Sequence, residues 1–338
     1  MAEDAQQRPG RAAATQQDVA DAVGVSRGLV SMALSGRGRM APGTRLRIVS
    51  AARDLGYHLN TAAAELASRQ SRRVAVIVPY LDNPYFDLLV RALRHEASRC
   101  GLLLVSFVSD LTDRIERETV DDVLSMRPRG LILPGTTLPE SDLRTIADDV
   151  RLCVIDRSLE DPTIDLVRMD EDGAAAQIVG HLAARGARTL VFLAPADQLT
   201  EPLITERREA CRRAAASSGL DFEWAACDDG VSSVLHGVLE RRAERIGAVA
   251  YNDVLGLDLL AAVLGSGLVP GRDVIAVSYD NSPLARRGEI ALTSVDQSPE
   301  ALAAAAVEAI LRDDGDPVVR RTVPARLVVR RSSTGPRG

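Results

Sequence analysis

Short apolar runs rich in β-branched residues alternate with longer helical patterns over most of this 338-residue chain. A first series consists of VAVIVPY, LLLVSFV, GLILP and LCVID, and a second of TLVFLA, DFEWAAC, AVAYN and VIAVSYD. This alternation is typical of parallel sheets joined by crossover helices, so the two series predict two doubly wound α/β lobes. Because such sheets bind ligands at the carboxyl ends of their strands, we expect a binding cleft between the lobes.

Charge is divided unevenly along the chain. Residues 1–73 hold 11 Arg against 6 acidic residues, a charge of +5, whereas the remainder holds 30 Arg against 41 acidic residues, a charge of −11. A basic segment ahead of an acidic body is expected when one end contacts a polyanion and the other stays in solution.

Neither a membrane span nor a secretory signal is expected. No uncharged apolar run approaches the roughly 18 residues that a spanning helix needs. The first residues, MAEDAQQRPGRAAA, lack the apolar stretch of a signal peptide. We therefore expect a cytoplasmic protein with no membrane partner.

The segment QDVADAVGVSRGLVSMALSG has the pattern of a helix-turn-helix. Thr15 can cap a first helix that Gly24 ends, and Ser26 can cap a second helix through Leu34. An αα-hairpin inside a helical core would also explain the apolar spacing, but not the local excess of Arg. The apolar positions are Val19, Ala20, Val23, Val25, Val30 and Ala33.

A third helix is predicted from Pro42 to Gly56, since proline favours the first helical turn and glycine a helix end. Its inner stripe is expected to be Leu46, Val49, Ala52 and Leu55. With this helix the segment forms an all-α DNA-binding head.

In such a head the second helix enters the major groove, which nominates Arg27, Gly28 and Met32 for base contacts. Arg27 could bind a guanine through O6 and N7, or equally a phosphate. The Ala-rich segment after Tyr57 could form a short helix that places Leu66 in the minor groove, with a plain linker as the alternative.

The motifs of cofactor enzymes are missing. No GxGxxG follows the first strand of either lobe, no P-loop occurs in a chain without lysine, and no GxSxG is present. Four cysteines and four histidines are too scattered for a disulfide framework or a metal site. Asp156, Asp253 and Asp280 follow predicted strands and could be catalytic or accept hydrogen bonds from ligand hydroxyls. We favour binding, with no catalytic residue, metal or cofactor.

Seven segments together resemble the LacI/GalR (lactose-repressor) family of bacterial transcription regulators, from Thr15 to about Ser332. The resemblance implies a homodimer, or a dimer of dimers, that binds a near-palindromic DNA operator, with a core of the periplasmic-binding-protein-like type I. The segments are DVADAVGVSRGLVS, APGTRLRIVSAARDLGY, DNPYFDLLVRAL, VIDR, YNDVLGLDLLAAVLGSGLVPGRDVIAVSYDNSPLA, LTSVDQ and RLVVRRSS.

The resemblance also implies site residues. Arg207 and Asp280 could bracket a sugar diol, or form a salt bridge across the cleft, beside an apolar face supplied by Phe86 or Tyr85. The DNA-binding set is Thr15, Ser26, Arg27, Gly28, Ser31, Met32, Asn60 and Leu66. The effector-binding set is Asn83, Tyr85, Phe86, Arg157, Arg207, Asn252, Asp253 and Asp280.

Some positions depart from the family pattern. In the hinge, Leu59 replaces a proline, Ala64 replaces an arginine, and Glu65 adds a negative charge. We expect these changes to weaken or retune DNA binding by the hinge. With only ten aromatic residues in the chain, a polar effector is favoured over one that needs several stacking rings.

The expected organisation follows from these patterns. A disordered tail covers 1–14, the helix-turn-helix domain 15–58 and the hinge 59–72. The core covers 73–332, with a first lobe of about 73–168 plus 297–321, a second of about 169–296 plus 322–332, and a flexible tail at 333–338. A sugar or sugar derivative in the cleft, as inducer or corepressor, would change the angle between the lobes and so control hinge pairing. A freestanding sugar-binding protein would carry a signal peptide in place of the head.

Overall fold

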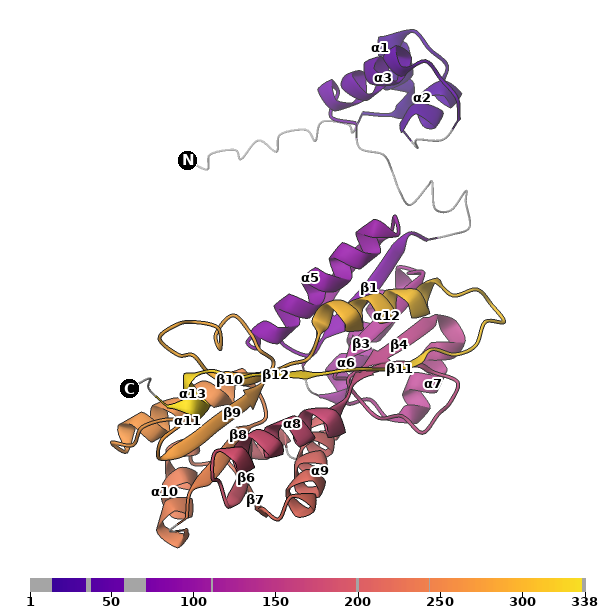
Figure 1. Cartoon of the computed structure of the whole chain (residues 1–338). Helices are drawn as coiled ribbons and strands as arrows, with labels where there is room; N and C mark the ends of the chain where they lie inside the picture. Colours follow the sequence, from indigo (N-terminus) through magenta and orange to yellow (C-terminus); the bar gives the residue numbers. More distant parts are fainter. Residues whose placement is uncertain are drawn as a thin grey trace, which may run out of the picture. The chain divides into compact units, whose positions relative to one another are not determined.

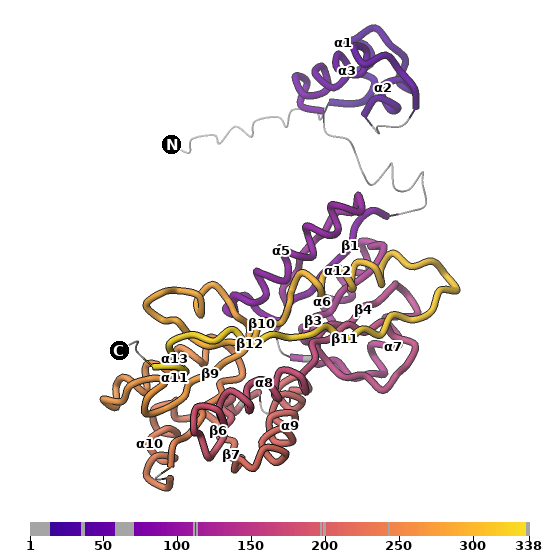
Figure 2. Tube along the Cα trace, viewed as in Figure 1, coloured from indigo at the N-terminus to yellow at the C-terminus, as the bar shows by residue number. Residues whose placement is uncertain are grey.

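The computed structural model describes residues 14–34, 38–57, 71–110, 112–198, 201–242 and 244–335 (Figures 1 and 2). The chain divides into two units, residues 1–70 and residues 71–338, and each is described by itself. Within the described residues no helix has both the length and the apolar character to cross a membrane.

The N-terminal unit contains the three predicted helices, α1 (Gln16–Val23), α2 (Arg27–Leu34) and α3 (Pro42–Asp54). Thr15 forms a capping box with Asp18, and Gly24 ends α1 in the left-handed conformation, with φ of 71°. The Ser26 hydroxyl accepts a hydrogen bond from the Leu29 amide at 3.2 Å, which caps α2. The predicted helix-turn-helix is therefore confirmed. Its buried residues are Val19, Ala20, Val30, Ala33, Ile48 and Ala52.

The inner stripe expected for α3 was wrong at three of its four positions. Leu46 is 70% exposed, and Val49 and Leu55 are also exposed, whereas Ile48 and Ala52 are buried. Each step of three residues turns an α-helix by about 300°, so a stripe made only of such steps spirals around the helix. The pair Ile48 and Ala52, four residues apart, stays on the face that α1 and α2 cover.

The first lobe of the core is a six-stranded sheet of order β11-β5-β4-β3-β1-β2, and the strand pairs are parallel. Helices cover both faces, so the lobe has one apolar core on each side of the sheet. Its strands are β1 (Arg73–Val78), β2 (Leu103–Val108), β3 (Gly130–Pro134), β4 (Arg151–Ile155), β5 (Asp165–Met169) and β11 (Arg320–Val323). Its helices are α5 (Pro84–Arg99), α6 (Asp113–Ser125), α7 (Glu140–Asp149) and α12 (Pro299–Leu311).

The second lobe repeats this topology with the order β12-β10-β9-β8-β6-β7, in which only β12 runs antiparallel to its neighbour. β4 of the first lobe thus corresponds to β9 of the second. The strands are β6 (Thr189–Ala194), β7 (Asp221–Ala226), β8 (Ile246–Ala250), β9 (Val274–Tyr279), β10 (Thr293–Asp296) and β12 (Arg326–Val328). The helices are α8 (Glu171–Ala184), the 3-10 helix η1 (Ala196–Gln198), α9 (Pro202–Ser217), α10 (Val231–Arg241), α11 (Asp253–Gly265) and α13 (Arg331–Thr334).

The chain passes between the lobes three times: after β5, between β10 and α12, and between β11 and β12 (Figure 1). The three crossovers are bonded to one another. The Asp170 amide donates to the Val323 carbonyl at 2.8 Å, and the Ser298 hydroxyl donates to the Pro324 carbonyl at 3.1 Å. The last crossover follows Val323, two residues beyond the expected boundary, because β11 pairs with β5 up to that residue.

The segment after residue 332 is partly ordered, contrary to the expected flexible tail. Ser333 lies in α13 and is fully buried. Its hydroxyl bonds to Thr293 Oγ1 at 2.6 Å and to His181 Nε2 at 2.8 Å. These side-chain hydrogen bonds fix residues 333–335 to the second lobe. No apolar periodicity in the sequence predicts them.

Candidate functional site

The predicted base-contacting residues share one exposed face of α2. All four are exposed: Arg27, Gly28, Ser31 and Met32. The last three follow Arg27 by one, four and five residues, so the four residues lie side by side on the helix. A Cβ atom on Gly28 would meet only the Ser26 hydroxyl, at 4.0 Å, so this face is open. A helix face with one guanidinium and small neighbours can approach the floor of a major groove.

The other predicted DNA-binding residues fall into two groups. Thr15 and Ser26 lie at the N-termini of α1 and α2, where their hydroxyls cap the helices. Asn60 and Leu66 lie outside the described residues, as does most of the predicted hinge at 59–72.

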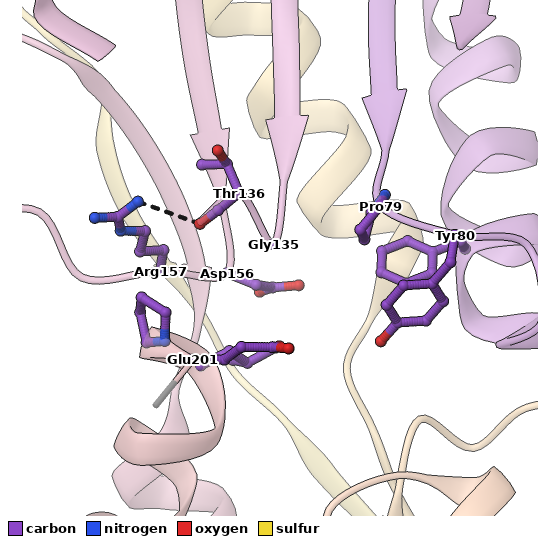
Figure 3. Close-up of a pocket in the computed structure, with 10 residues that line it drawn as sticks. Pro79, Tyr80, Gly135, Thr136, Asp156, Arg157 and Glu201 are labelled. Atoms are coloured by element: carbon purple, nitrogen blue, oxygen red, sulfur yellow. Dashed lines mark hydrogen bonds between the residues drawn. The ribbon is translucent and has the colours of Figure 1, made fainter. Parts of the chain in front are cut away.

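A pocket lies between the two lobes (Figure 3). Its first-lobe wall follows the ends of β1, β3 and β4, and its second-lobe wall is the start of α9, so the sheets present their carboxyl ends as expected. The cavity volume of about 30 Å³ has room for about two water molecules. A solute the size of a sugar therefore requires the lobes or their side chains to move. The lining residues are Pro79, Tyr80, Phe86, Gly135, Thr136, Asp156, Arg157, Glu201, Pro202 and Leu203.

Asp156, at the end of β4, is the buried acid of the first-lobe wall. Its carboxylate accepts the Tyr85 hydroxyl at 2.9 Å and the Met169 amide at 3.2 Å. Phe86 packs edge-on against Tyr80, with ring centroids 5.1 Å apart. Tyr85 thus orients the acid, whereas Phe86 lines the pocket as an apolar face.

Asp280, at the end of β9, holds the corresponding position in the second lobe. Its carboxylate accepts Gln297 Nε2 at 2.5 Å and Asn83 Nδ2 at 3.0 Å. Asn83 also caps α5 in the first lobe, since its side chain accepts the Tyr85 amide. The contact between Asn83 and Asp280 is therefore a hydrogen bond between the lobes.

Arg207 is 2% exposed, and its guanidinium is held by three acceptors. They are Glu171 Oε1 at 3.1 Å, the Tyr251 carbonyl at 2.9 Å and Gln297 Oε1 at 2.9 Å. Arg207 lies in α9 and Asp280 follows β9, so both belong to the second lobe. The alternative reading, a salt bridge between them across the cleft, is therefore wrong, and the buried ion pair of Arg207 is with Glu171. Although burial opposes it, the charges of Glu171 and Asp280 raise the pKa of Arg207.

The buried acids around Arg207 have raised pKa values. Burial raises the pKa of Glu171 to about 7, against the lowering effect of Arg207. Burial and the charge of Asp253 raise the pKa of Asp280 to about 7. Burial also raises the pKa of Asp156. In an environment of low polarity, one guanidinium does not compensate three carboxylates.

Two predicted effector residues form hydrogen bonds within the second lobe. Asn252 caps α11 by accepting the Leu255 amide at 2.9 Å. The fully buried Asp253 carboxylate accepts Ser278 Oγ at 2.5 Å and Ser294 Oγ at 2.7 Å, together with the Ser282 amide at 2.6 Å. Three donors from its own lobe occupy this carboxylate, so the expectation that it binds effector is not supported by its surroundings.

Arg157 lines the pocket as expected, and its Nη1 donates to the Thr136 carbonyl at 3.2 Å (Figure 3). The same nitrogen donates to the Leu138 carbonyl at 2.5 Å. Tyr80, Thr136 and Glu201 line the pocket but were not predicted. Tyr80 and Thr136 follow β1 and β3, so the rule that selected the strand-end carboxylates could have found them.

A second set of contacts between the lobes lies around Glu206 of α9. Glu206 Oε1 accepts the Ser158 amide of the first lobe at 2.5 Å, and Oε2 pairs with Arg168 of β5 at 3.2 Å. Arg168 also donates to the Ser158 hydroxyl. Nothing in the sequence marked Glu206, because its partners are 48 and 38 residues away along the chain.

A helix-turn-helix head on a core of two doubly wound lobes with a buried polar cleft defines a ligand-sensing DNA-binding regulator. Residues 15–60 match the family described as bacterial regulatory proteins, lacI family, and residues 179–333 match the periplasmic binding protein-like domain. The HTH-type transcriptional regulator PtxS of Pseudomonas aeruginosa is 30% identical over 98% of both chains. The chain belongs to the LacI family. It is a DNA-binding transcriptional regulator.

Solved structures show the same fold. A crystal structure of the Lac repressor dimer bound to operator and the anti-inducer ONPF has a TM-score of 0.80 at 22% identity, over 95% of this chain and 99% of that one. The complex of the transcriptional regulator CelR with cellobiose has a TM-score of 0.66 at 23% identity, over 94% and 99%.

Proposed function

We propose that this protein is a cytoplasmic repressor that binds a near-palindromic operator as a homodimer. A sugar or sugar derivative that enters the inter-lobe cleft weakens or strengthens this DNA binding. One observation carries the proposal: the same chain holds an exposed recognition face on α2 and a pocket between two lobes, whose wall includes Asp156, Arg157 and Glu201. The operator-bound Lac repressor dimer and the cellobiose complex of CelR support the two kinds of ligand.

In the DNA complex, Arg27 is the residue that reads a base, because its forked donors match the O6 and N7 acceptors of guanine. Gly28 and Ser31 allow close approach of α2, and Met32 supplies an apolar contact. Leu66 of the hinge contacts the minor groove, and Asn60 is a further DNA-binding residue.

In the effector complex, Asp156 and Asp280 accept hydrogen bonds from the ligand, one from each lobe. Arg157 and Arg207 hold the polar groups around the cleft in place through their hydrogen bonds, and Phe86 offers the apolar face. Asn83 and Tyr85 orient the two acids. Effector binding changes the angle between the lobes, and the sign of its effect on DNA binding follows from which angle the effector favours.

The experiment that tests DNA binding is selection of bound sequences from random duplexes, followed by affinity measurements on the selected site. We expect a two-fold symmetric site. Arg27→Ala should cost about 1–3 kcal/mol and relax the preference at one base pair of each half-site. Affinity should fall steeply with salt, because Arg contacts release counterions from the DNA.

The matched control is Arg91→Ala, which removes an exposed guanidinium from α5 of the core, where it pairs with Asp87. This variant should select the same site with the same affinity. A protein that selects no sequence at modest salt, with or without sugars, contradicts the proposed function.

A further inference from the structure

The cleft contains more buried negative charge than positive charge. Asp156, Glu171 and Asp280 are each at most 5% exposed, and among the described residues only Arg207 contributes a buried guanidinium. Glu201 adds a carboxylate to the pocket wall and Arg157 a guanidinium. The side chains around the cleft therefore bring four carboxylates against two guanidinium groups.

Both guanidinium groups already serve acceptors of the protein. Arg207 is held by Glu171, the Tyr251 carbonyl and Gln297, and it lies over the Tyr279 ring at 4.5 Å. Arg157 Nη1 is directed to two carbonyls of the first lobe. A carboxylate on the ligand would have to compete with the three acceptors of Arg207, and it would enter a region that already holds an excess of negative charge.

One buried acceptor is left unsatisfied. Glu171 Oε2 has no hydrogen-bond partner, although the other oxygen binds Arg207. Figure 3 shows the side chains of Asp156 and Glu201 facing the same cavity from opposite lobes. Buried carboxylates without full pairing are costly, so such a site must gain protons or positive charge from elsewhere. The raised pKa values of Glu171 and Asp280 are the response to this excess in the protein alone.

We propose that the effector is an amino sugar or a similar polyhydroxylated amine, bound as its ammonium form between the carboxylates of the two lobes. This assignment rests on the proposed function and names the chemical class of its effector. An ammonium supplies three donors and one positive charge, whereas a hydroxyl at the same place supplies one donor and no charge. Charge-assisted hydrogen bonds are roughly twice as strong as neutral ones.

The test compares matched sugars that differ in one group. The 2-amino-2-deoxy sugars, the parent hexoses and the uronic acids of the glucose, galactose and mannose series are titrated into the full chain near pH 7, with calorimetry and thermal shift as readouts. We expect the tightest binder to be an amine, at least tenfold tighter than its parent hexose, and the uronic acid of the same series to bind more weakly than both.

Two variants separate charge from packing. Glu171→Gln keeps an acceptor for Arg207 and removes one negative charge, so the preference for the amine over its parent hexose should fall by about tenfold. Asp172→Asn removes a carboxylate from the next position of α8, where it is exposed and pairs with Arg213, and should leave the preference unchanged.

Each outcome decides the matter. If a neutral hexose or a uronic acid binds as tightly as the matched amine, the amine assignment is wrong. If that ligand no longer binds the Asp280→Ala variant, the proposed function still stands. If no sugar of any series binds, both the amine assignment and the proposed sugar effector fail. If Glu171→Gln folds and keeps the full preference, the charge argument is wrong.

Discussion

Asp156 and Asp280 adopt backbone angles that residues with a side chain rarely adopt, with φ of 58° and 102°. Each such residue costs of the order of 1–3 kcal/mol. The strand neighbours hold them in place: the Asp156 amide donates to the Val167 carbonyl and the Asp280 amide to the Val295 carbonyl. The two strained acids stand at equivalent strand ends of the two lobes, and both face the cleft where we place the effector.

The raised pKa of Glu171 links stability to pH. Its pKa lies near 4.5 in an unfolded chain and near 7 in the folded protein, so the folded state binds more protons between these values. The stabilising effect is complete below about pH 4.5 and is lost as the pH rises through 7. We expect the free energy of unfolding to fall across this window, and Glu171→Gln to remove up to about 3 kcal/mol of that fall.

Denaturant unfolding of both proteins at pH values from 5 to 8 measures this difference. Subtracting the variant from the parent protein cancels the contributions of the other acids. A difference that does not change with pH would show that the Glu171 carboxyl has the same pKa folded and unfolded.

Some residues of the cleft could be predicted from the sequence and others could not. Strand ends mark Asp156 and Asp280, because parallel strands bring their carboxyl ends together. Glu171 gave no such signal: it begins α8, where an acidic residue is ordinary on any exposed helix. Only the packing of α8 against α9 buries it beside Arg207.

At the scale of elements, α9 combines three tasks within two turns. Its N-cap Glu201 lines the pocket, Arg207 orders the buried polar groups, and Glu206 between them binds the first lobe. One helix of the second lobe thereby contacts the ligand pocket and the lobe interface together.

Glu206→Gln should loosen the contact between the lobes. Glutamine keeps an acceptor for the Ser158 amide but loses the ion pair with Arg168, which is 29% exposed. We expect effector affinity to fall about fivefold, which corresponds to about 1 kcal/mol for a partly exposed pair. Calorimetry with the effector found in the sugar comparison checks the value.

Glu209→Gln is the matched control on the same helix, since among the described residues Glu209 pairs with neighbouring arginines of α9. It should bind effector like the parent protein. An unchanged affinity in Glu206→Gln would mean that the lobes close without help from this contact.

Prediction of strands succeeded where the sequence contains a clear apolar run, and it missed β5 and β10 although both are largely buried. The central strands β1, β3, β8 and β9 are continuous apolar runs because helices cover both faces of each sheet. Edge strands β11 and β12, with exposed arginines, give no such run. The face of α3 was misjudged because the predicted stripe advances only in steps of three residues, whereas the buried residues Ile48 and Ala52 are four residues apart.

At the scale of the whole molecule, the core has its own apolar clusters and the N-terminal unit has another. A fragment of residues 71–338 should therefore fold by itself and bind the effector within about twofold of the full chain, while losing affinity for operator DNA. Thermal unfolding with and without effector, and gel shifts with the selected operator, measure both properties.

A fragment that fails to fold, or that folds and no longer binds effector, would show that the core depends on residues 1–70. The fold class of the head and of the core was predictable, because the two differ in charge and in hydrophobic period. The order of the segment around Ser333 was not predictable, because hydrogen bonds between hydroxyl groups, and not apolar contacts, fix it.

The three bonded crossovers have a consequence for how the core withstands proteolysis. A protease that cuts one of them divides the chain into two fragments. At least one fragment still runs through both lobes, and the sheet hydrogen bonds and apolar packing within each lobe hold the other fragment in place. Such a nicked protein should keep its fold and its ability to respond to a metabolite. A two-lobed protein whose lobes are joined by a single linker would lose both when that linker is cut.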